Sequence, residues 1–155
     1  MNPGRATVRT AHRVGMAAHL LLFDGDGQLL VIRRGVTGYL DGYWSVPAGH
    51  IEPGETAAAA CARETAEEVG LVLDPAEDLR FALVQMKSGV DGEERVDFFF
   101  TARPRRVQVP RIASPREVAG LRWVLPDALP EPFAPYVFSA LDAYEKGRNY
   151  STWGL

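Results

Sequence analysis

Three glutamates, Glu64, Glu67 and Glu68, lie within one short segment that is rich in Ala and Glu. On an α-helix, which turns about 100° per residue, Glu68 lies about 40° to one side of Glu64 and Glu67 about 60° to the other, so the carboxylates share one stripe. Like charges at this spacing repel each other, and within the helix only Arg63, one turn before Glu67, is placed to offset the repulsion. Clustered carboxylate oxygens are the ligands that Mg²⁺ and Mn²⁺ prefer, and Mg²⁺ is commonly shared with the phosphate oxygens of a substrate. The spacing thus indicates a metal site for a phosphate-bearing substrate, and a solvated acidic helix face is the alternative.

The segment that carries these glutamates predicts a helix over residues 56–69. Ala and Glu favour helix, and Gly70 lies where a glycine in the left-handed conformation commonly ends one. Beside the acids runs a small, mostly apolar stripe that can pack on a sheet. This stripe consists of Ala58, Ala62, Thr65 and Val69. We therefore expect the helix to be anchored on one side and to present its carboxylates outward.

Alternating apolar residues predict strands on both sides of this helix. Residues 13–23 alternate with period two, and residues 28–34 follow after a Gly-containing turn, so we expect these two strands to pair as a hairpin. Residues 43–46 are predicted to be short and extended, and Pro and Gly residues predict irregular structure over 47–54. The remaining predicted elements are a hairpin of strands at 79–87 and 95–102, a strand at 121–125 and a closing helix at 135–146. Strand pairs around two helices predict an α/β or α+β fold with a mixed sheet packed between helices.

Composition limits the class of protein. The 155 residues, 46% of them hydrophobic and 24% charged, fit one soluble globular domain. We expect residues 13–155 to form it and residues 1–12 to be a flexible N-terminal arm. A net charge of -3 has the wrong sign for binding a nucleic-acid polymer. The longest apolar stretch, residues 16–23, is far shorter than the roughly 20 residues needed to span a membrane. Cys61 is the only cysteine, so no intrachain disulfide forms and a cytoplasmic location is the default expectation. We expect the protein to be a monomer or a homodimer.

The residues around the glutamate helix resemble the signature of Nudix (MutT-like) hydrolases. The signature requires a glycine, a glutamate six residues later, and then Arg-Glu, Glu-Glu and a final glycine at set spacing. Gly49, Glu55 and the run RETAEEVGL at residues 63–71 match all seven fixed positions, which would occur by chance about once in 10⁸ windows. Thr65 departs from the usual aliphatic residue, and we expect only slightly weaker packing there. From about residue 13 to 146 the chain resembles a single Nudix domain, an α/β/α sandwich.

This resemblance implies an activity and a set of site residues. Nudix hydrolases cleave a nucleoside diphosphate linked to another moiety, by metal-assisted attack of water on phosphorus. The metal, Mg²⁺ with Mn²⁺ as an alternative, is expected at Glu64, Glu67, Glu68 and the main-chain carbonyl of Gly49. Glu55 and Arg63 match the positions that orient these ligands.

The general base has more than one candidate. In the family it is sometimes a glutamate of the signature, here Glu64 or Glu67, and sometimes an acid from a later loop. Candidates of the second kind are Glu93, Glu94 and Glu117. We take Glu64 as the first choice.

Substrate contacts are predicted before and beside the signature. Arg33 and Arg34 end a strand and point to opposite faces, so only one of them is expected to reach phosphate oxygens. His50 adjoins Gly49 and is a candidate phosphate contact or a structural hydrogen bonder. Tyr39, Tyr43 and Trp44 either stack on a base or belong to the core. Asp97 shares a strand face with Phe99, and the sequence assigns it no role.

Marks of particular Nudix subgroups are absent. Met86 stands where ADP-ribose pyrophosphatases tend to have proline, and Gly89 where dinucleoside polyphosphate hydrolases tend to have tyrosine. The Ser-Gln-Pro-Trp segment typical of NADH pyrophosphatases is also missing from the sequence. We therefore expect a nucleoside triphosphate as substrate, giving monophosphate and pyrophosphate. The alternatives are hydrolysis of ADP-ribose, nucleotide sugars or dinucleoside polyphosphates, or a nucleotide-sensing domain without catalysis, which usually loses signature glutamates that are all present here.

Overall fold

The computed structural model describes residues 10–155, and these residues form two sheets and two helices. The first sheet contains, in spatial order, β4 (Ala48–His50), β1 (Gly15–Leu21), β6 (Glu94–Ala102), β5 (Leu79–Ser88) and β8 (Tyr150–Trp153). The second contains β3 (Trp44–Ser45), β2 (Leu29–Arg34) and β7 (Val118–Val124). In the first sheet β1 pairs parallel with β6 and antiparallel with β4, so the sheet is mixed, as predicted. The prediction of a flexible arm over residues 1–12 lies mostly outside the described residues.

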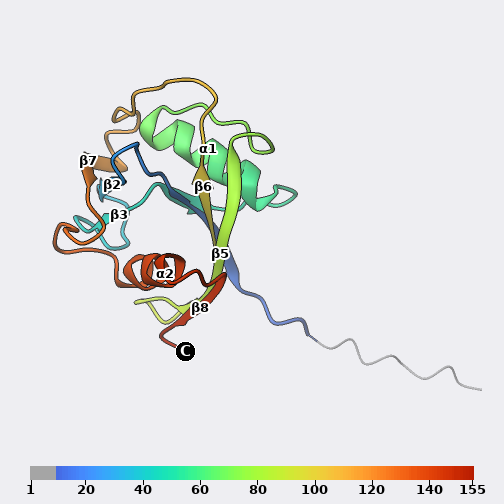
Figure 1. Cartoon of the computed structure of the whole chain (residues 1–155). Coiled ribbons are helices and arrows are strands. Elements are labelled where there is room, and N and C mark those ends of the chain that lie inside the picture. Colours follow the sequence, from blue (N-terminus) through green and yellow to red (C-terminus); the bar gives the residue numbers. More distant parts are fainter. Residues whose placement is uncertain (1–9) are drawn as a thin grey trace, which may run out of the picture.

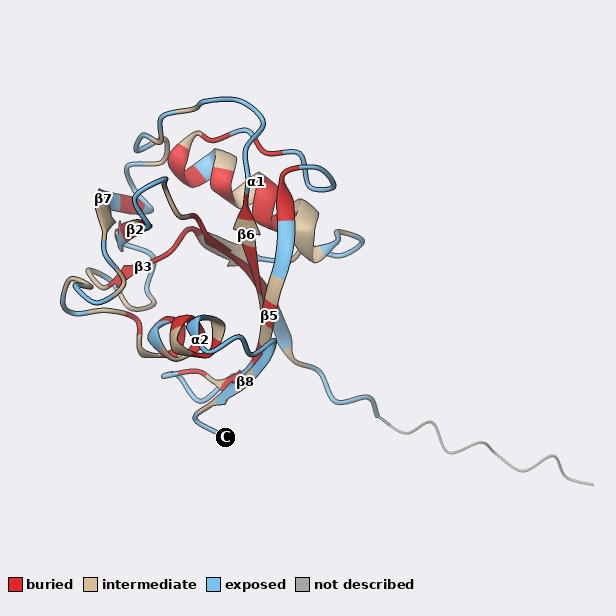
Figure 2. Ribbon diagram, in the orientation of Figure 1, coloured by how far each residue is buried: buried red, intermediate tan, exposed pale blue. Residues whose placement is uncertain are grey.

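The helices α1 (Ala57–Val69) and α2 (Pro135–Glu145) lie on opposite sides of the first sheet (Figure 1). Consecutive residues of β1 point to opposite faces. Leu20 joins the buried cluster around α1, and Leu21 joins the cluster around α2. Figure 2 shows the buried residues gathered where the helices meet the strands. The predicted α/β/α sandwich is confirmed. Neither described helix is long and apolar enough to cross a membrane.

Local signals fix the ends of both helices. The Thr56 hydroxyl accepts a hydrogen bond from the Ala59 amide at 3.1 Å and caps α1, and Gly70 ends the helix at φ 70°. Pro135 occupies the first turn of α2, where its fixed φ suits a helix start. The predicted helices at 56–69 and 135–146 are thus confirmed to within one residue at each end.

The predicted pairing of the first two strands is wrong. The turn itself forms, because the Asp24 carboxylate accepts hydrogen bonds from two amides of the turn and a single bridge joins Phe23 to Leu29. Beyond the turn, however, β1 enters the first sheet and β2 enters the second, where it pairs with β3 and β7. A turn fixes only the residues next to it, and longer-range partners decide where each strand continues.

Two short strands were not predicted. β4 lies in the segment expected to be irregular, and its residues Ala48, Gly49 and His50 pair with β1. β8 is an edge strand of the first sheet and pairs parallel with β5. The predicted hairpin of residues 79–87 and 95–102 is confirmed as β5 and β6, with Phe98 and Phe100 both packed in the cluster around α1.

Candidate active site

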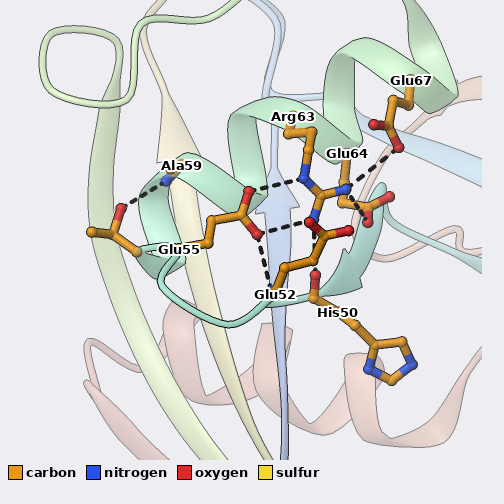
Figure 3. Close-up of polar contacts among 8 residues, drawn as sticks. His50, Glu52, Glu55, Ala59, Arg63, Glu64 and Glu67 are labelled. Carbon is orange, nitrogen blue, oxygen red and sulfur yellow. Dashed lines mark hydrogen bonds and ion pairs between the residues drawn. The ribbon is translucent and has the colours of Figure 1, made fainter.

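One arginine ties the loop before α1 to the helix (Figure 3). Arg63 donates from Nε to Glu55 Oε1 at 2.8 Å, and from Nη2 to Glu55 Oε2 and to the His50 carbonyl, both at 3.0 Å. Its Nη1 donates to Glu64 Oε1 at 2.8 Å and makes a longer contact of 3.5 Å with Glu67 Oε2. The hydrogen bonds that Arg63 donates to Glu55 and Glu64 raise the pKa of Arg63, and Arg63 in turn lowers the pKa of Glu55. This network fixes the position of α1 relative to β4.

Gly49 has no room for a side chain. A Cβ atom built on it would lie 2.0 Å from Cδ of Glu64, far inside van der Waals contact. The main chain of β4 therefore lies directly against the Glu64 carboxylate, and this approach requires glycine. The geometry gives a physical reason for the glycine that opens the signature.

Glu68 is buried, contrary to the expectation that all the carboxylates face outward. It is 7% exposed, whereas the Glu67 side chain is 54% exposed. Burial, and then the nearby Glu64 carboxylate, raises the pKa of Glu68 well above its ordinary value, and burial also raises the pKa of Glu64. The Glu68 Oε2 atom has no hydrogen-bond partner among the described residues. A buried carboxylate that has one unpartnered oxygen and lies beside a second carboxylate is a group that a cation stabilises.

The donor set fits a divalent cation. Within residues 10–155 no three acidic, histidine or cysteine side chains already converge as a metal site. Glu64 and Glu67 instead each direct one oxygen toward Arg63, which leaves the second oxygen of each carboxylate for an ion. Carboxylates and a main-chain carbonyl are hard oxygen ligands, which suit Mg²⁺ or Mn²⁺.

A pocket of about 610 Å³ runs from these glutamates across both sheets. Glu64, Glu68 and Glu117 line what we call the acidic end. His19, Lys87 and Tyr136 line what we call the distal end. Arg34 lines the same pocket, and its charge lowers the pKa of Glu68 at the acidic end and of Tyr136 at the distal end, although burial raises both.

The structure brings some of the predicted substrate contacts to this pocket and leaves others outside. Arg34 and His50 line it. Arg33 donates to the Gly42 carbonyl at 3.3 Å instead, and neither Arg33 nor Tyr43 lines the pocket. Of the three acids from later loops, only Glu117 lines the pocket.

The distal end contains residues to which the sequence assigned no role. His19 Nε2 lies 3.3 Å from Asp97 Oδ2, and the Lys87 ammonium forms an ion pair with the same oxygen. Lys87 Nζ also lies 3.2 Å from the centre of the Tyr136 ring. Burial lowers the pKa of both His19 and Lys87, and these two groups hold the pKa of Asp97 below its ordinary value although burial opposes this. The available signal was that Lys87 and Asp97 alternate in step with the buried Leu83 and Phe99 of their own strands.

Comparison with known proteins places the chain among Nudix proteins. The family model described as NUDIX domain matches residues 13–144. An isopentenyl-diphosphate Delta-isomerase of Streptomyces coelicolor is 36% identical over 146 residues, covering 88% of this chain and 72% of that protein. An RNA pyrophosphohydrolase of Erythrobacter litoralis is 29% identical over 139 residues, covering 80% of this chain and 84% of that protein. The solved structure of a MutT NUDIX hydrolase from Burkholderia pseudomallei matches with a TM-score of 0.74 at 25% identity, covering 84% of this chain and 98% of that chain.

Proposed function

The chain belongs to the Nudix family, and from this premise we propose that it hydrolyses a pyrophosphate bond in a nucleoside diphosphate linked to another moiety. The preferred substrate is a nucleoside triphosphate, which gives a monophosphate and pyrophosphate. The observation that carries the proposal is the buried carboxylate of Glu68, whose Oε2 has no hydrogen-bond partner among the described residues, beside Glu64 on the pocket wall. The pyrophosphohydrolase among the relatives supports the same reaction type.

Glu64, Glu67 and Glu68, together with the Gly49 carbonyl, would hold Mg²⁺, or Mn²⁺ in its place. The ion, when bound, supplies polarisation of the phosphoryl oxygens and a lowered pKa for a bound water. Arg63 orients Glu64 and Glu67 through the contacts described above. Its ion pair with Glu55 prevents the arginine from competing fully for the metal-binding carboxylates.

Arg34 is the phosphate contact in this proposal. Its Nε donates to the Tyr39 carbonyl and one terminal nitrogen donates to the Thr37 hydroxyl, which fixes the guanidinium at the pocket wall. No carboxylate pairs with it among the described residues, so its remaining N–H groups are free to donate to phosphate oxygens.

Two carboxylates can take the proton of the attacking water. Glu64 stays our first choice, and Glu117 is the second because it lines the same end of the pocket. Glu64 accepts a hydrogen bond from Arg63, whereas the Glu117 side chain has no such partner among the described residues. The base is identified by the pH dependence of kcat, since only its replacement by Gln removes the acidic limb of the profile.

A second candidate is isomerisation of isopentenyl diphosphate, which the 36% identity to the Streptomyces isomerase favours. Both reactions use a diphosphate group, so the acidic end and Arg34 suit either one. The isomerisation moves protons on carbon and leaves the diphosphate intact. The only thiol of the chain, Cys61, is buried in the cluster around α1, and burial raises its pKa to about 12, so it takes no part in such proton transfer.

One experiment separates these functions. The purified protein is incubated with Mg²⁺ and nucleoside triphosphates, ADP-ribose, nucleotide sugars, dinucleoside polyphosphates and isopentenyl diphosphate, and products are resolved by chromatography and NMR. We expect monophosphate and pyrophosphate from a triphosphate, lost in Glu68→Gln. Cleavage of only the larger diphosphate-linked compounds would keep the reaction and change the substrate. Conversion of isopentenyl diphosphate to its isomer would establish the second candidate, and thermal stabilisation by a nucleotide without turnover of any compound would establish a sensing role.

A further inference from the structure

The buried ion pair at the distal end is costly for a purely structural element. Lys87 is 3% exposed and Asp97 is fully buried. Placing two charges out of water has a large desolvation cost, and a well-packed apolar pair at such positions is often as stable or more stable. Lys87 nevertheless forms part of the pocket wall, while Asp97 lies behind it. The placement points to a role for the lysine in the pocket.

The donors of Lys87 leave one N–H group for a ligand. An ammonium carries three donors and no acceptor. One donor is directed to Asp97, and a second faces the ring of Tyr136. No other protein acceptor is within hydrogen-bond distance of the ammonium among residues 10–155.

The other cations of the pocket have different partners or positions. Arg95 binds Asp91 through both terminal nitrogens. Arg34 is assigned to phosphate. Among the described residues, Lys87 is thus the cation of the distal end with a free N–H group, and it shares the pocket wall with His19, whose two ring nitrogens also have no hydrogen-bond partner.

The sheet register shows which part of a substrate reaches Lys87. From β4, which carries Gly49, the sheet order runs through β1 and β6 to β5, which carries Lys87. Three strand spacings correspond to about 14 Å, and Lys87 lies a further three residues, or about 10 Å, along β5 from Val84, which is level with Gly49. A substrate whose diphosphate lies at Glu64 and Glu68 therefore reaches Lys87 with the far end of its nucleoside, which is the base.

We propose that Lys87 is a specificity residue whose ammonium donates a hydrogen bond to a carbonyl oxygen on the base of the substrate nucleotide, with Asp97 positioning the lysine. This inference rests on the proposed function and names the substrate class: nucleotides with a carbonyl at the base edge. An exocyclic amino group, as in adenine, presents N–H donors to a group that can only donate, so both would lack an acceptor. A purely hydrocarbon chain offers no acceptor either.

Inosine and adenosine triphosphates provide the matched pair of substrates, because they share sugar and phosphates and differ at this base edge. We expect the wild-type kcat/KM to favour inosine triphosphate by about tenfold or more. In Lys87→Met the preference falls toward one, through a higher KM for inosine triphosphate and little change for adenosine triphosphate. Lys146→Met is the matched control, because Lys146 is the only other lysine and forms an exposed pair with Asp142 at 2.7 Å. It should keep the wild-type preference.

A second variant separates recognition from folding. Lys87→Met leaves the Asp97 carboxylate buried without its cation, so the double variant Lys87→Met/Asp97→Asn removes both charges together. Circular dichroism and thermal unfolding verify that it folds, and it should also lose the preference. An unchanged preference, or an equal loss on both nucleotides, would overturn the proposal.

The same preference is measured by calorimetric binding in a Glu67→Gln background with Mg²⁺, which needs no turnover. Tighter binding of inosine triphosphate that depends on Lys87, in a protein whose wild type hydrolyses neither nucleotide, would refute the hydrolase and retain the recognition. Equal binding of the two nucleotides in a protein whose wild type hydrolyses both would refute base recognition by Lys87 and retain the hydrolase.

Discussion

The two ends of the pocket differ in how their buried charges are compensated. At the acidic end, Glu64 and Glu68 repel each other, and one oxygen of Glu68 has no partner among the described residues. At the distal end, Asp97 Oδ1 also has no hydrogen-bond partner among the described residues, but the charge of Asp97 is balanced by its ion pair with Lys87. The acidic end therefore needs a cation from outside to be stable, whereas the distal end is neutral by itself. The uncompensated carboxylate of Glu68 thus belongs to the proposed metal site, and the compensated pair of Lys87 and Asp97 belongs to the proposed recognition site.

The largest effect is expected at the acidic end. Glu67→Gln keeps the shape of the side chain and removes a charged oxygen ligand, so we expect kcat for the best substrate to fall on the order of 10³-fold. Steady-state kinetics at saturating Mg²⁺ measures this loss. Glu145→Gln, an exposed glutamate at the end of α2, is the control and should retain full activity. Full activity in Glu67→Gln would remove that residue from the proposed metal site.

The close approach at Gly49 gives the next largest effect. In Gly49→Ala the new methyl group overlaps the Glu64 carboxylate, so β4 and α1 must separate and the acidic end loses its alignment. We expect kcat to fall on the order of 10- to 100-fold, with the distal preference for the base unchanged. Gly25→Ala is the matched control, since nothing lies within 4 Å of a Cβ at that turn. Wild-type kinetics in Gly49→Ala would show that the approach has no catalytic importance.

The same contrast explains which features the sequence revealed. The acidic end comes from residues 49–71, where the metal-binding glutamates, the glycine and the bracing arginine follow one another at fixed spacing. Helix caps are local as well, so the bounds of α1 could be predicted from Thr56 and Gly70. The burial of Glu68 could not be predicted, because it depends on how closely α1 packs on β4 rather than on the period of the helix.

The distal end depends on pairings across the chain. Lys87 meets Asp97 because the pairing of β5 and β6 puts Asp97 opposite Gln85, diagonal to Lys87, and it meets Tyr136 because α2 packs on that face of the sheet. The sequence of one strand does not show which residue of another strand lies beside it. The separation of β1 and β2 into different sheets has the same origin, since their turn contains no information about β4, β6 or β7.

The smallest effect concerns stability and has opposite signs at the two ends. Because the folded-state pKa of Glu68 is raised above its unfolded value, the unfolded chain ionises first as pH rises, and the folded state loses stability through this window. Below the ordinary glutamate pKa the penalty is absent. In EDTA at neutral pH we therefore expect Glu68→Gln to raise the free energy of unfolding by about 1–2 kcal/mol.

Asp97→Asn provides the contrast, because it leaves the Lys87 ammonium buried without its carboxylate and should lower the free energy of unfolding with or without Mg²⁺. Denaturant unfolding in EDTA and in excess Mg²⁺ measures both variants. Added Mg²⁺ should stabilise the wild type and reverse the advantage of Glu68→Gln, since ion binding to the folded state favours that state. If Glu68→Gln were less stable than the wild type in EDTA at every pH, the Glu68 carboxylate would be compensated by the protein itself, and the difference between the two ends would disappear.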